Sequence, residues 1–221
     1  MDITKCAVYG GVNVGLYVTV GDTFLLVPSG MVPAKADVLS ELLGAPWHHV
    51  SISGTRLLGA MCAHNGVSMI LPKTLFQSEY DVLQDILPDN VHVLDARYTA
   101  LGNLICANRR GAIVSPLFSG PERDAIQDAL GVETVSMHVA GMVQSGSVAT
   151  TNDTGTVVHP LADEDEQSDI ADILGTRVEP STINNGVPYV SSGLLVNNTS
   201  VVIGDMTTGP EIMMLTRAFL G

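Results

Sequence analysis

The sequence predicts an α/β protein in which five ββαβ repeats form a closed ring. Two independent markers, a glycine and a leucine, recur at intervals of about 44 residues. Each interval carries signals for a strand, a turn, a second strand and a helix, in that order. We therefore expect one domain over residues 1–221, with repeats at approximately 10–53, 54–97, 98–141, 142–186 and 187–221.

The first strand of each repeat is expected after a glycine that opens an apolar segment. These glycines are Gly15, Gly59, Gly102, Gly146 and Gly193, at successive steps of 44, 43, 44 and 47 residues. Each segment ends in Asn, Asp or Gly, which tolerate the positive φ of tight hairpin turns. The expected turns are Gly21-Asp22, Asn65-Gly66, residues 108–111, residues 152–155 and Asn197-Asn198.

A second apolar strand is expected after each turn, at residues 24–27, 67–71, 112–114, 156–158 and 201–203. Proline ends a strand naturally because it cannot donate a hydrogen bond to a sheet ladder. Four of these strands are followed by a proline, namely Pro28, Pro72, Pro116 and Pro160. The fifth strand has Asp205 at this place.

An amphipathic helix should come next, because apolar residues then recur at spacings of three and four. The residues on the apolar stripes are Leu39, Leu42 and Leu43; Val82, Leu83, Ile86 and Leu87; Ile126 and Leu130; Ile170, Ile173 and Leu174; and Leu215, Phe219 and Leu220. Each helix ends in leucine followed by a residue that favours a helix end: Gly44, Pro88, Gly131, Gly175 and Gly221. The terminal leucines step by 44, 43, 44 and 46 residues.

A third strand is expected after four of the helices, at residues 50–52, 91–94 and 135–139 and near Val178. The fifth helix has no such strand after it, and the apolar segment 3–9 can take that place. The alternative is an open solenoid, which needs polar caps at both ends. The last helix carries Met213, Met214 and Phe219, so it is a poor cap and a closed ring is favoured.

Composition indicates a globular protein with an acidic surface. Of 221 residues, 46% are hydrophobic, which is enough to build a core. We find neither an apolar run long enough to span a bilayer nor a signal peptide in residues 1–5, so a cytoplasmic location is expected. A net charge of -13 repels phosphate backbones, so a nucleoprotein partner should be met mainly through basic protein. Adaptation to a salty cytoplasm is a second interpretation of the same charge.

No cofactor or metal is expected. The three cysteines, Cys6, Cys62 and Cys106, have no short spacing and suggest buried hydrophobes rather than a zinc site. His48 and His49 would point to opposite faces of an extended segment and cannot easily bind one ion. The acidic run at residues 163–166 lacks the ligand order of a calcium loop and should lead into the fourth helix.

Five segments resemble one known family in the same order and at the same spacing. The second repeat opens with the segment 53–59, Ser-Gly-Thr-Arg-Leu-Leu-Gly. Segment 99–103 (Thr-Ala-Leu-Gly-Asn) resembles the family's "S-A-L-G-N", and segment 157–160 (Val-Val-His-Pro) its "L-V-H-P". Segments 182–186 and 193–197 are similar to its "T-V-N-R-G" and "G-M-V-V-N-D". The whole chain thus resembles the archaeal translation initiation factor 6 family, whose fold is the pentein or five-bladed α-β propeller.

This resemblance implies a factor without catalytic activity. The family binds the large ribosomal subunit, chiefly through a ribosomal protein of the intersubunit face and with rRNA nearby, and sterically blocks joining of the small subunit. A role in large-subunit biogenesis is also implied, whereas a membrane partner or a small-molecule substrate is not. Carried over position by position, the ribosome-binding residues are Arg56, Leu57, Gly59, Asn103, Ser147 and Asn197.

Asn103 is the most informative of these residues. It directly follows Gly102, where other repeats have Leu16, Ala60 and Leu194, and its amide can both donate and accept at an interface. The alternative is a turn residue that bonds its own backbone.

Three other functions were weighed. Pentein-fold hydrolases or transferases of amidino groups need a cysteine nucleophile late in the chain, and no cysteine follows Cys106. A sliding clamp needs a basic channel, which ten basic residues scattered over the chain cannot line. A scaffold ring fits the composition but leaves the motif matches unexplained.

Overall fold

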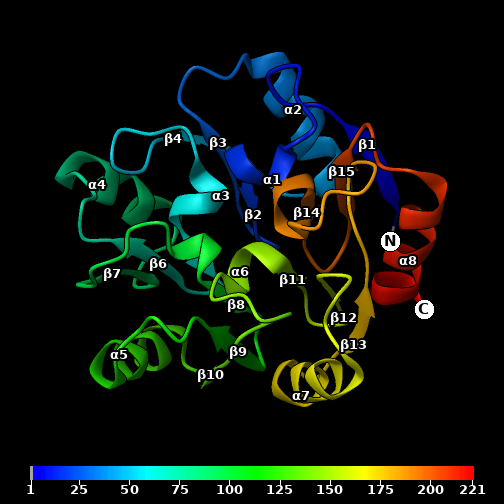
Figure 1. Ribbon diagram of the computed structural model, residues 1–221. Coiled ribbons are helices and arrows are strands. Elements are labelled where there is room, and N and C mark those ends of the chain that lie inside the picture. Colours follow the sequence, from blue (N-terminus) through cyan, green and yellow to red (C-terminus); the bar gives the residue numbers. More distant parts are fainter. Residues whose placement is uncertain (1) are drawn as a thin grey trace.

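Five three-stranded sheets, each with one outer helix, make up the fold. The computed structural model describes residues 2–221. In Figure 1 the helices α2, α4, α5, α7 and α8 lie around the outside, and short helices lie near the middle. Mixed sheets of this order, repeated five times, are the α/β pentein architecture that the repeat pattern predicts.

Each unit runs from a short helix through two strands and an outer helix to a third strand. Unit 1 consists of α1 (Val14–Tyr17), β2 (Thr19–Val20), β3 (Leu25–Pro28), α2 (Pro33–Leu43) and β4 (Trp47–Val50). Unit 2 consists of α3 (Leu58–Met61), β5 (Ala63–His64), β6 (Met69–Pro72), α4 (Gln77–Ile86) and β7 (Val91–Leu94). Unit 3 consists of the 3₁₀ helix η1 (Leu101–Asn103), β8 (Ile105–Ala107), β9 (Gly111–Val114), α5 (Gly120–Leu130) and β10 (Glu133–Ser136).

Unit 4 consists of α6 (Ser145–Val148), β11 (Ala149–Thr151), β12 (Gly155–Val158), α7 (Glu164–Leu174) and β13 (Arg177–Pro180). Unit 5 consists of the 3₁₀ helix η2 (Val190–Gly193), β14 (Leu194–Val196), β15 (Val201–Gly204) and α8 (Gly209–Leu220). The second strand is central in every sheet, antiparallel to the first strand and parallel to the third. A tight turn joins the antiparallel pair, and the outer helix makes the crossover to the parallel strand.

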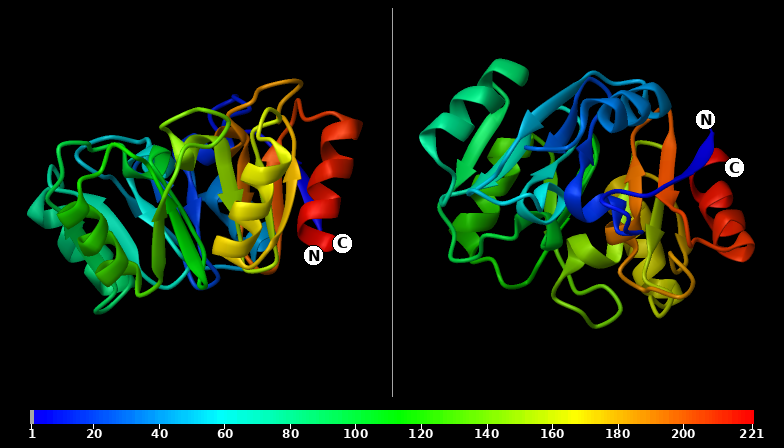
Figure 2. Two further views of the ribbon diagram at one scale, coloured as in Figure 1. Left: turned by 60° about the horizontal axis from the view of Figure 1, so that its bottom comes forward. Right: turned by 90° about the horizontal axis from the view of Figure 1, so that it is seen from above.

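The third strand of the fifth sheet comes from the other end of the chain. β1 (Ile3–Cys6) pairs in parallel with β15, from Ile3 opposite Val201 to Cys6 opposite Gly204. Figure 2 accordingly shows the two chain ends side by side, with β1 next to α8. The short helix α1 of unit 1 also contacts η2 of unit 5, as α3 contacts α1. We propose that these contacts close the five units into a ring.

Local sequence explains where the outer helices begin and end. Asp163 precedes α7 and accepts a hydrogen bond from the Glu166 backbone N–H, so the acidic run does lead into the fourth outer helix. Gly44, Gly131 and Gly175 follow α2, α5 and α7 in the left-handed conformation, with φ of 68°, 66° and 61°. Glycine adopts this conformation at little cost, so the predicted helix ends are confirmed.

The core is divided among neighbouring units, because each outer helix packs between two sheets. Leu39 and Leu43 of α2 share one apolar cluster with Leu195 and Val202 of the fifth sheet. Other clusters join neighbouring units in the same way. No helix among residues 2–221 is both long and apolar enough to cross a membrane.

The glycines predicted to open strands lie instead inside the short helices. Gly15, Gly59 and Gly146 fall within α1, α3 and α6, and the first strands begin only afterwards. Each helical turn satisfies its own backbone: the Val18 N–H donates to Val14 O at 3.2 Å, and the Cys62 N–H to Leu58 O at 3.0 Å. Glycine is needed because a Cβ on Gly59 would overlap Gly15 O, and one on Gly102 would overlap Gly59 O.

The repeat position of the fifth unit differs from the prediction by two residues. Ser191, and not the predicted Gly193, takes the place of the repeat glycine, because Gly15 of unit 1 packs on the backbone oxygen of Ser191. The step from Gly146 to Ser191 is 45 residues, which makes the repeats more even than the predicted 47. Gly193 ends η2, where unit 1 has Tyr17.

Two of the third strands begin earlier than predicted. β4 covers Trp47–Val50 and β10 covers Glu133–Ser136, against predictions of residues 50–52 and 135–139. These strands lie on the outer edges of their sheets and carry polar, half-exposed residues, so apolar patterning misplaced them. Likewise Val82 and Leu220, assigned to the apolar stripes of α4 and α8, are 44% and 40% exposed.

Removing residues 1–9 tests the proposed closure. The deletion should lower the thermal midpoint by roughly 5–15 °C, because β15 loses its partner and each kcal/mol shifts the midpoint of a domain this size by about 2–4 °C. Differential scanning calorimetry measures the shift, with Lys5→Ala as a control that keeps the strand. An unshifted midpoint after deletion would exclude closure by β1.

Replacing Gly102 by alanine tests the close packing of the short helices. The new Cβ would overlap Gly59 O, and it would come within 2.5 Å of Cys62 O, so we expect unfolding free energy to fall by about 2–3 kcal/mol. Gly120→Ala is the matched control, because a Cβ there meets nothing within 4 Å. Urea unfolding that ranks the two variants equally would contradict the packing argument.

Candidate binding surface

The five units surround a central hollow whose two ends are built differently. The hollow has a volume of about 110 Å³ and is lined by the first strands and by Gly15, Gly59, Gly102 and Gly146. We call one end the helix end: the short helices and the loops that lead into them, residues 8–17, 52–61, 95–103, 139–148 and 183–193. We call the other the turn end: the hairpin turns at 21–24, 65–68, 108–111, 152–155 and 197–200.

Asparagine side chains tie neighbouring units together at the turn end. The amide Nδ2 of Asn197 donates to Leu43 O at 2.8 Å, and that of Asn108 donates to Leu174 O at 2.9 Å. Asn65 donates in the same way to Leu130 O at 2.8 Å. These acceptors are the last residues of outer helices, whose carbonyls lack partners inside the helix. Each asparagine therefore caps the C-terminus of the outer helix of the next unit.

Charged groups from three units and an asparagine from a fourth meet at the same end. Arg109 lies 2.7 Å from the Asp22 carboxylate and 3.5 Å from that of Asp153. The Asn198 Nδ2 donates to both carboxylates, at 2.8 and 2.7 Å. This network uses its polar groups internally, so the turn end offers few unpaired groups to a partner.

Asn197 is therefore separated from the other predicted site residues. Its side chain is 4% exposed, and its Oδ1 accepts from the backbone N–H groups of Thr199 and Ser200. Its donors and acceptor are all engaged in holding the turn end, so we leave Asn197 out of the surface considered below.

Three of the predicted residues do come together at the helix end. Gly59, Asn103 and Ser147 line a hollow of about 470 Å³, together with Leu16 and Ser192. They meet because each short helix packs against its neighbours.

The Asn103 side chain makes no hydrogen bond within the described chain, residues 2–221. Its backbone N–H donates to Ala100 O at 3.1 Å, which keeps the 3₁₀ turn, while the half-buried amide is left over. The Asn103 amide therefore does not hydrogen-bond its own backbone, which was the alternative considered from the sequence. A free amide beside a hollow can donate and accept toward a partner.

Arg56 and Leu57 lie on the exposed loop just before α3, the helix whose Gly59 and Ala60 line this hollow. Leu57 is 37% exposed, and the Arg56 guanidinium reaches over Gly30 of unit 1. No salt bridge holds Arg56 among the described residues. Both side chains can therefore reach a partner from the helix end.

Exposed apolar side chains recur around the helix end in all five units. Of fourteen large hydrophobic residues exposed in residues 2–221, three belong to this end and five more lie beside it, where the outer helices begin. Those in the loops of the helix end are Tyr9, Leu57 and Tyr189. Those at the rim, where the outer helices begin, are Val32, Phe76, Leu117, Leu161 and Met206. An apolar concentration of this kind is typical of a protein interface. We call these eight residues, with Arg56, Asn103, Ser147 and Ser192, the helix-end face.

Ser191 and Ser192 are absent from the predicted site because the prediction puts the repeat glycine of the fifth unit at Gly193, two residues beyond Ser191. Ser191 Oγ donates to Ser147 O at 3.1 Å, and so joins units 4 and 5. The spacing to the hairpin turns could have identified Ser191 from the sequence. Gly15, Gly59, Gly102 and Gly146 each lie six positions before the first turn residue, and Ser191 lies six positions before Asn197. Three of the five positions after these residues are consequently polar, namely Asn103, Ser147 and Ser192.

Buried glutamates hold the loops of the helix end in place. Glu211, near the start of α8, is 6% exposed and accepts hydrogen bonds from the backbone N–H groups of Asn185 and Gly186. Glu79 of α4 accepts from Ser53 and Gly54 in the same way. Burial alone would raise the pKa of Glu211, but hydrogen bonds from Thr208, Thr182 and Gly186 lower it to about 2.

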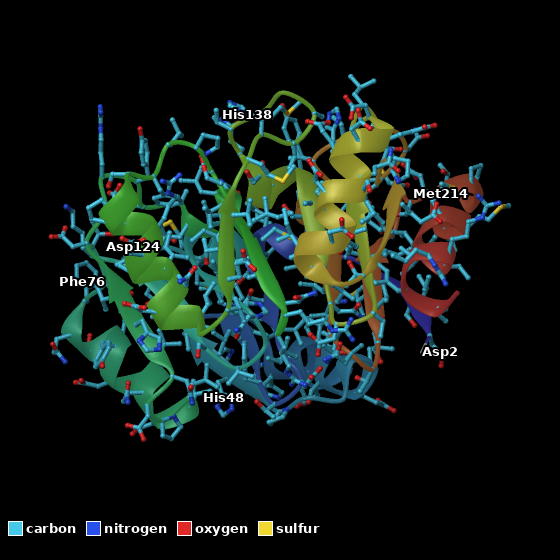
Figure 3. All side chains as sticks on the ribbon, turned by 90° about the horizontal axis from the view of Figure 1, so that it is seen from below. Asp2, His48, Phe76, Asp124, His138 and Met214 are labelled. Carbon is cyan, nitrogen blue, oxygen red and sulfur yellow. The ribbon has the colours of Figure 1, made fainter. Side chains whose placement is uncertain are left out.

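Histidines and acids do not converge on a metal site. Figure 3 shows His48 and His138 on different sides of the molecule, and Asp124 on the outside of α5. Across residues 2–221, no three His, Cys, Asp or Glu residues are arranged to hold an ion. Burial lowers the pKa of His64 to about 4, although Asp22 opposes the shift, so this ring is neutral at pH 7.

Comparison with known families and relatives gives one consistent answer. The model of the eIF-6 family matches residues 3–218. Translation initiation factor 6 of Nitrosopumilus maritimus is 49% identical over 220 residues, and that of Cenarchaeum symbiosum is 44% identical over 221 residues. In both cases the similarity covers 100% of each chain.

Solved structures with a similar fold are enzymes of low sequence identity. A dimethylarginine dimethylaminohydrolase superposes with a TM-score of 0.52 at 12% identity, covering 76% of this chain and 68% of that one. The N-terminal domain of a cyanobacterial arginine dihydrolase gives 0.53 at 13% identity, covering 81% and 72%. At this identity the likeness concerns the fold, which supports the pentein architecture.

Replacing Glu211 by glutamine should destabilise the protein in a pH-dependent way. The pKa of Glu211 is depressed from 4.5 to about 2 by folding, so its stabilisation is complete above pH 4.5 and is lost as the pH falls toward 2. Glu211→Gln should therefore lose about 2–3 kcal/mol at pH 7 and match the parent near pH 2. Glu41→Gln, at an exposed position of α2, is the control. Chemical unfolding with a constant difference across pH 2–7 would refute this role.

Proposed function

This chain belongs to the eIF-6 family, and we propose that it binds the large ribosomal subunit and prevents the small subunit from joining. The observation that carries the proposal is the full-length match to this family and to two archaeal translation initiation factors. The names of these relatives, translation initiation factor 6, support a part in translation initiation, and binding to the large subunit is what we infer beyond that. A contribution to large-subunit biogenesis and a cytoplasmic location belong to the same proposal.

The helix-end face is the surface we assign to the ribosome. It combines the free Asn103 amide and the Arg56 guanidinium with an apolar rim, whereas the turn end pairs its polar groups internally. Interfaces are rich in exposed apolar and arginine side chains, and unpaired polar groups can bond across them. Arg56, Leu57, Gly59, Asn103 and Ser147 are thus retained as contact residues, with Ser192 and the rim added.

The charge of the chain favours protein over bare RNA as the main contact. Ten basic residues face 23 acidic ones, and several carboxylates lie on the outer helices, as Asp124 does on α5. A basic ribosomal protein of the intersubunit face is the partner that such a surface suits. Arg56 can add a contact to nearby rRNA phosphate.

Occlusion is the proposed mechanism. The five-unit body places its bulk over the face that the small subunit would occupy, so no nucleotide, metal or covalent step is needed. Such a blocker works for as long as it stays bound, so a slow off-rate or an active removal step is required.

We infer no amidino-hydrolase activity despite the shared fold. An enzyme of that type needs a nucleophile with a base in hydrogen-bond reach. Burial raises the pKa of Cys62 and of Cys106 to about 12, so both stay as thiols at neutral pH. His48 and His138 lie on different sides of the molecule (Figure 3).

A sucrose gradient with purified archaeal ribosomal subunits tests the proposal. The protein should sediment with the large subunit and reduce the joined peak when small subunits are added. Migration at the top of the gradient, with joining unaffected, would overturn both binding and occlusion.

Asn103→Arg should weaken large-subunit binding about tenfold or more, which corresponds to about 1.4 kcal/mol. The larger cation enters the hollow of about 470 Å³ that the partner must approach. Asn103→Asp should weaken binding too, and neither change should move the thermal midpoint, because the side chain has no partner in the described chain. Met213→Arg, on an exposed position of α8, is the control. Unchanged affinity of both Asn103 variants would remove Asn103 from the site.

A further inference from the structure

Unit 1 differs from the other units at one position of its outer helix. The third residue of α4, α5, α7 and α8 is a glutamate that reaches back to the helix start: Glu79, Glu122, Glu166 and Glu211. The third residue of α2 is Lys35. Its Nζ donates to the Cys6 Sγ at 3.1 Å, which joins α2 to the end of β1.

Cys6 has surroundings unlike those of the other two cysteines. Cys62 and Cys106 lie among apolar groups on the central hollow, and burial raises the pKa of each to about 12. Cys6 is 7% exposed and shares its contact with a half-exposed lysine. Across residues 2–221 no carboxylate forms a salt bridge with Lys35, so the sulfur is the recorded partner of its ammonium group.

We propose that Cys6 and Lys35 form a reversible oxidative cross-link when the protein meets hydrogen peroxide. Peroxide oxidises a cysteine through its thiolate form. At 3.1 Å the nitrogen already lies within reach of the sulfur, so the link needs little movement of either chain segment.

The chemistry balances with peroxide as the oxidant. The Cys6 thiolate attacks one peroxide oxygen: an S–O bond forms, the O–O bond breaks, and hydroxide leaves, while sulfur loses two electrons and peroxide gains them. The hydroxide takes a proton from the Lys35 ammonium to give water. The free amine then attacks the sulfenic sulfur, so an S–N bond forms and the S–O bond breaks. The departing hydroxide takes one proton from the attacking nitrogen and leaves as a second water. Sulfenic acids condense with nitrogen in this way to give sulfenamides, which thiols can reverse.

The link would fasten the strand on which the proposed closure depends. β1 is held to unit 5 through its ladder with β15, and a bond from Cys6 to Lys35 would join it covalently to α2 of unit 1. Cross-links of this kind stabilise by restricting the unfolded chain. Oxidised protein should therefore melt at a higher midpoint than reduced protein.

Peptide mapping reads the link directly. Trypsin cuts after Lys5 and Lys35, so reduced protein yields peptide 6–35. A bond to the Lys35 nitrogen blocks the second cut, and the product becomes peptide 6–56, ending at Arg56 and lighter by two hydrogens than the sum of its sequence. The full chain is treated with hydrogen peroxide, digested with and without prior dithiothreitol, and sequenced by mass spectrometry.

We expect loss of peptide 6–35, gain of linked peptide 6–56, and reversal by dithiothreitol. Lys35→Arg keeps the positive charge but lacks the primary amine, so it should oxidise at Cys6 without a link and without a raised midpoint. Cys106→Ser should behave like the parent.

Two results would overturn the proposal. One is full recovery of peptide 6–35 after excess peroxide, whether Cys6 is intact or carried to sulfinic acid. The other is a two-hydrogen loss that persists in Lys35→Arg, since it would place the bond elsewhere.

Discussion

Contact between glycine backbones and the carbonyl oxygens of the neighbouring short helix sets how closely the units approach one another. Gly59 lies on Gly15 O, Gly102 on Gly59 O and Gly146 on Gly102 O, and a Cβ at any of them would overlap its neighbour. The first strands are therefore drawn around a hollow of only about 110 Å³. Outer helices then fill the wedges between sheets, because each one finds an apolar face on either side.

This packing gives the molecule two ends with different chemistry. At the turn end, asparagine amides and the network of Arg109, Asp22 and Asp153 satisfy one another across units. At the helix end, the short helices use their backbone groups internally and leave the Asn103 side chain free beside an apolar rim. The contrast is what directs the functional proposal to one face. The buried carboxylates of Glu79 and Glu211 hold the loops that shape this face.

Much of the fold could be predicted from the sequence because repetition supplied an internal check. Turn asparagines and helix-ending glycines such as Gly44 follow from local chemistry. The partnership of β1 with the last sheet follows from counting strands, because the fifth repeat lacks a third strand of its own. Short helices could not be told from strands, since one turn has no period to detect. The proposed site was only partly predictable. The motifs point to Asn103 and Ser147, whereas the side chain of Asn197 is occupied by hydrogen bonds at the turn end, and the apolar rim draws on residues far apart in the chain.

Hydroxyl-radical footprinting of the protein with and without large ribosomal subunits tests the central claim most directly. The account predicts that Tyr9, Phe76, Leu161 and Tyr189 of the helix-end face become protected, while Met213 on the outside of α8 is oxidised at an unchanged rate. The oxidation rate of an exposed side chain falls when a partner covers it, whatever that side chain contributes to the affinity. Protection confined to Met213 or to the turn end would contradict the account, because a face other than the one described would then meet the ribosome.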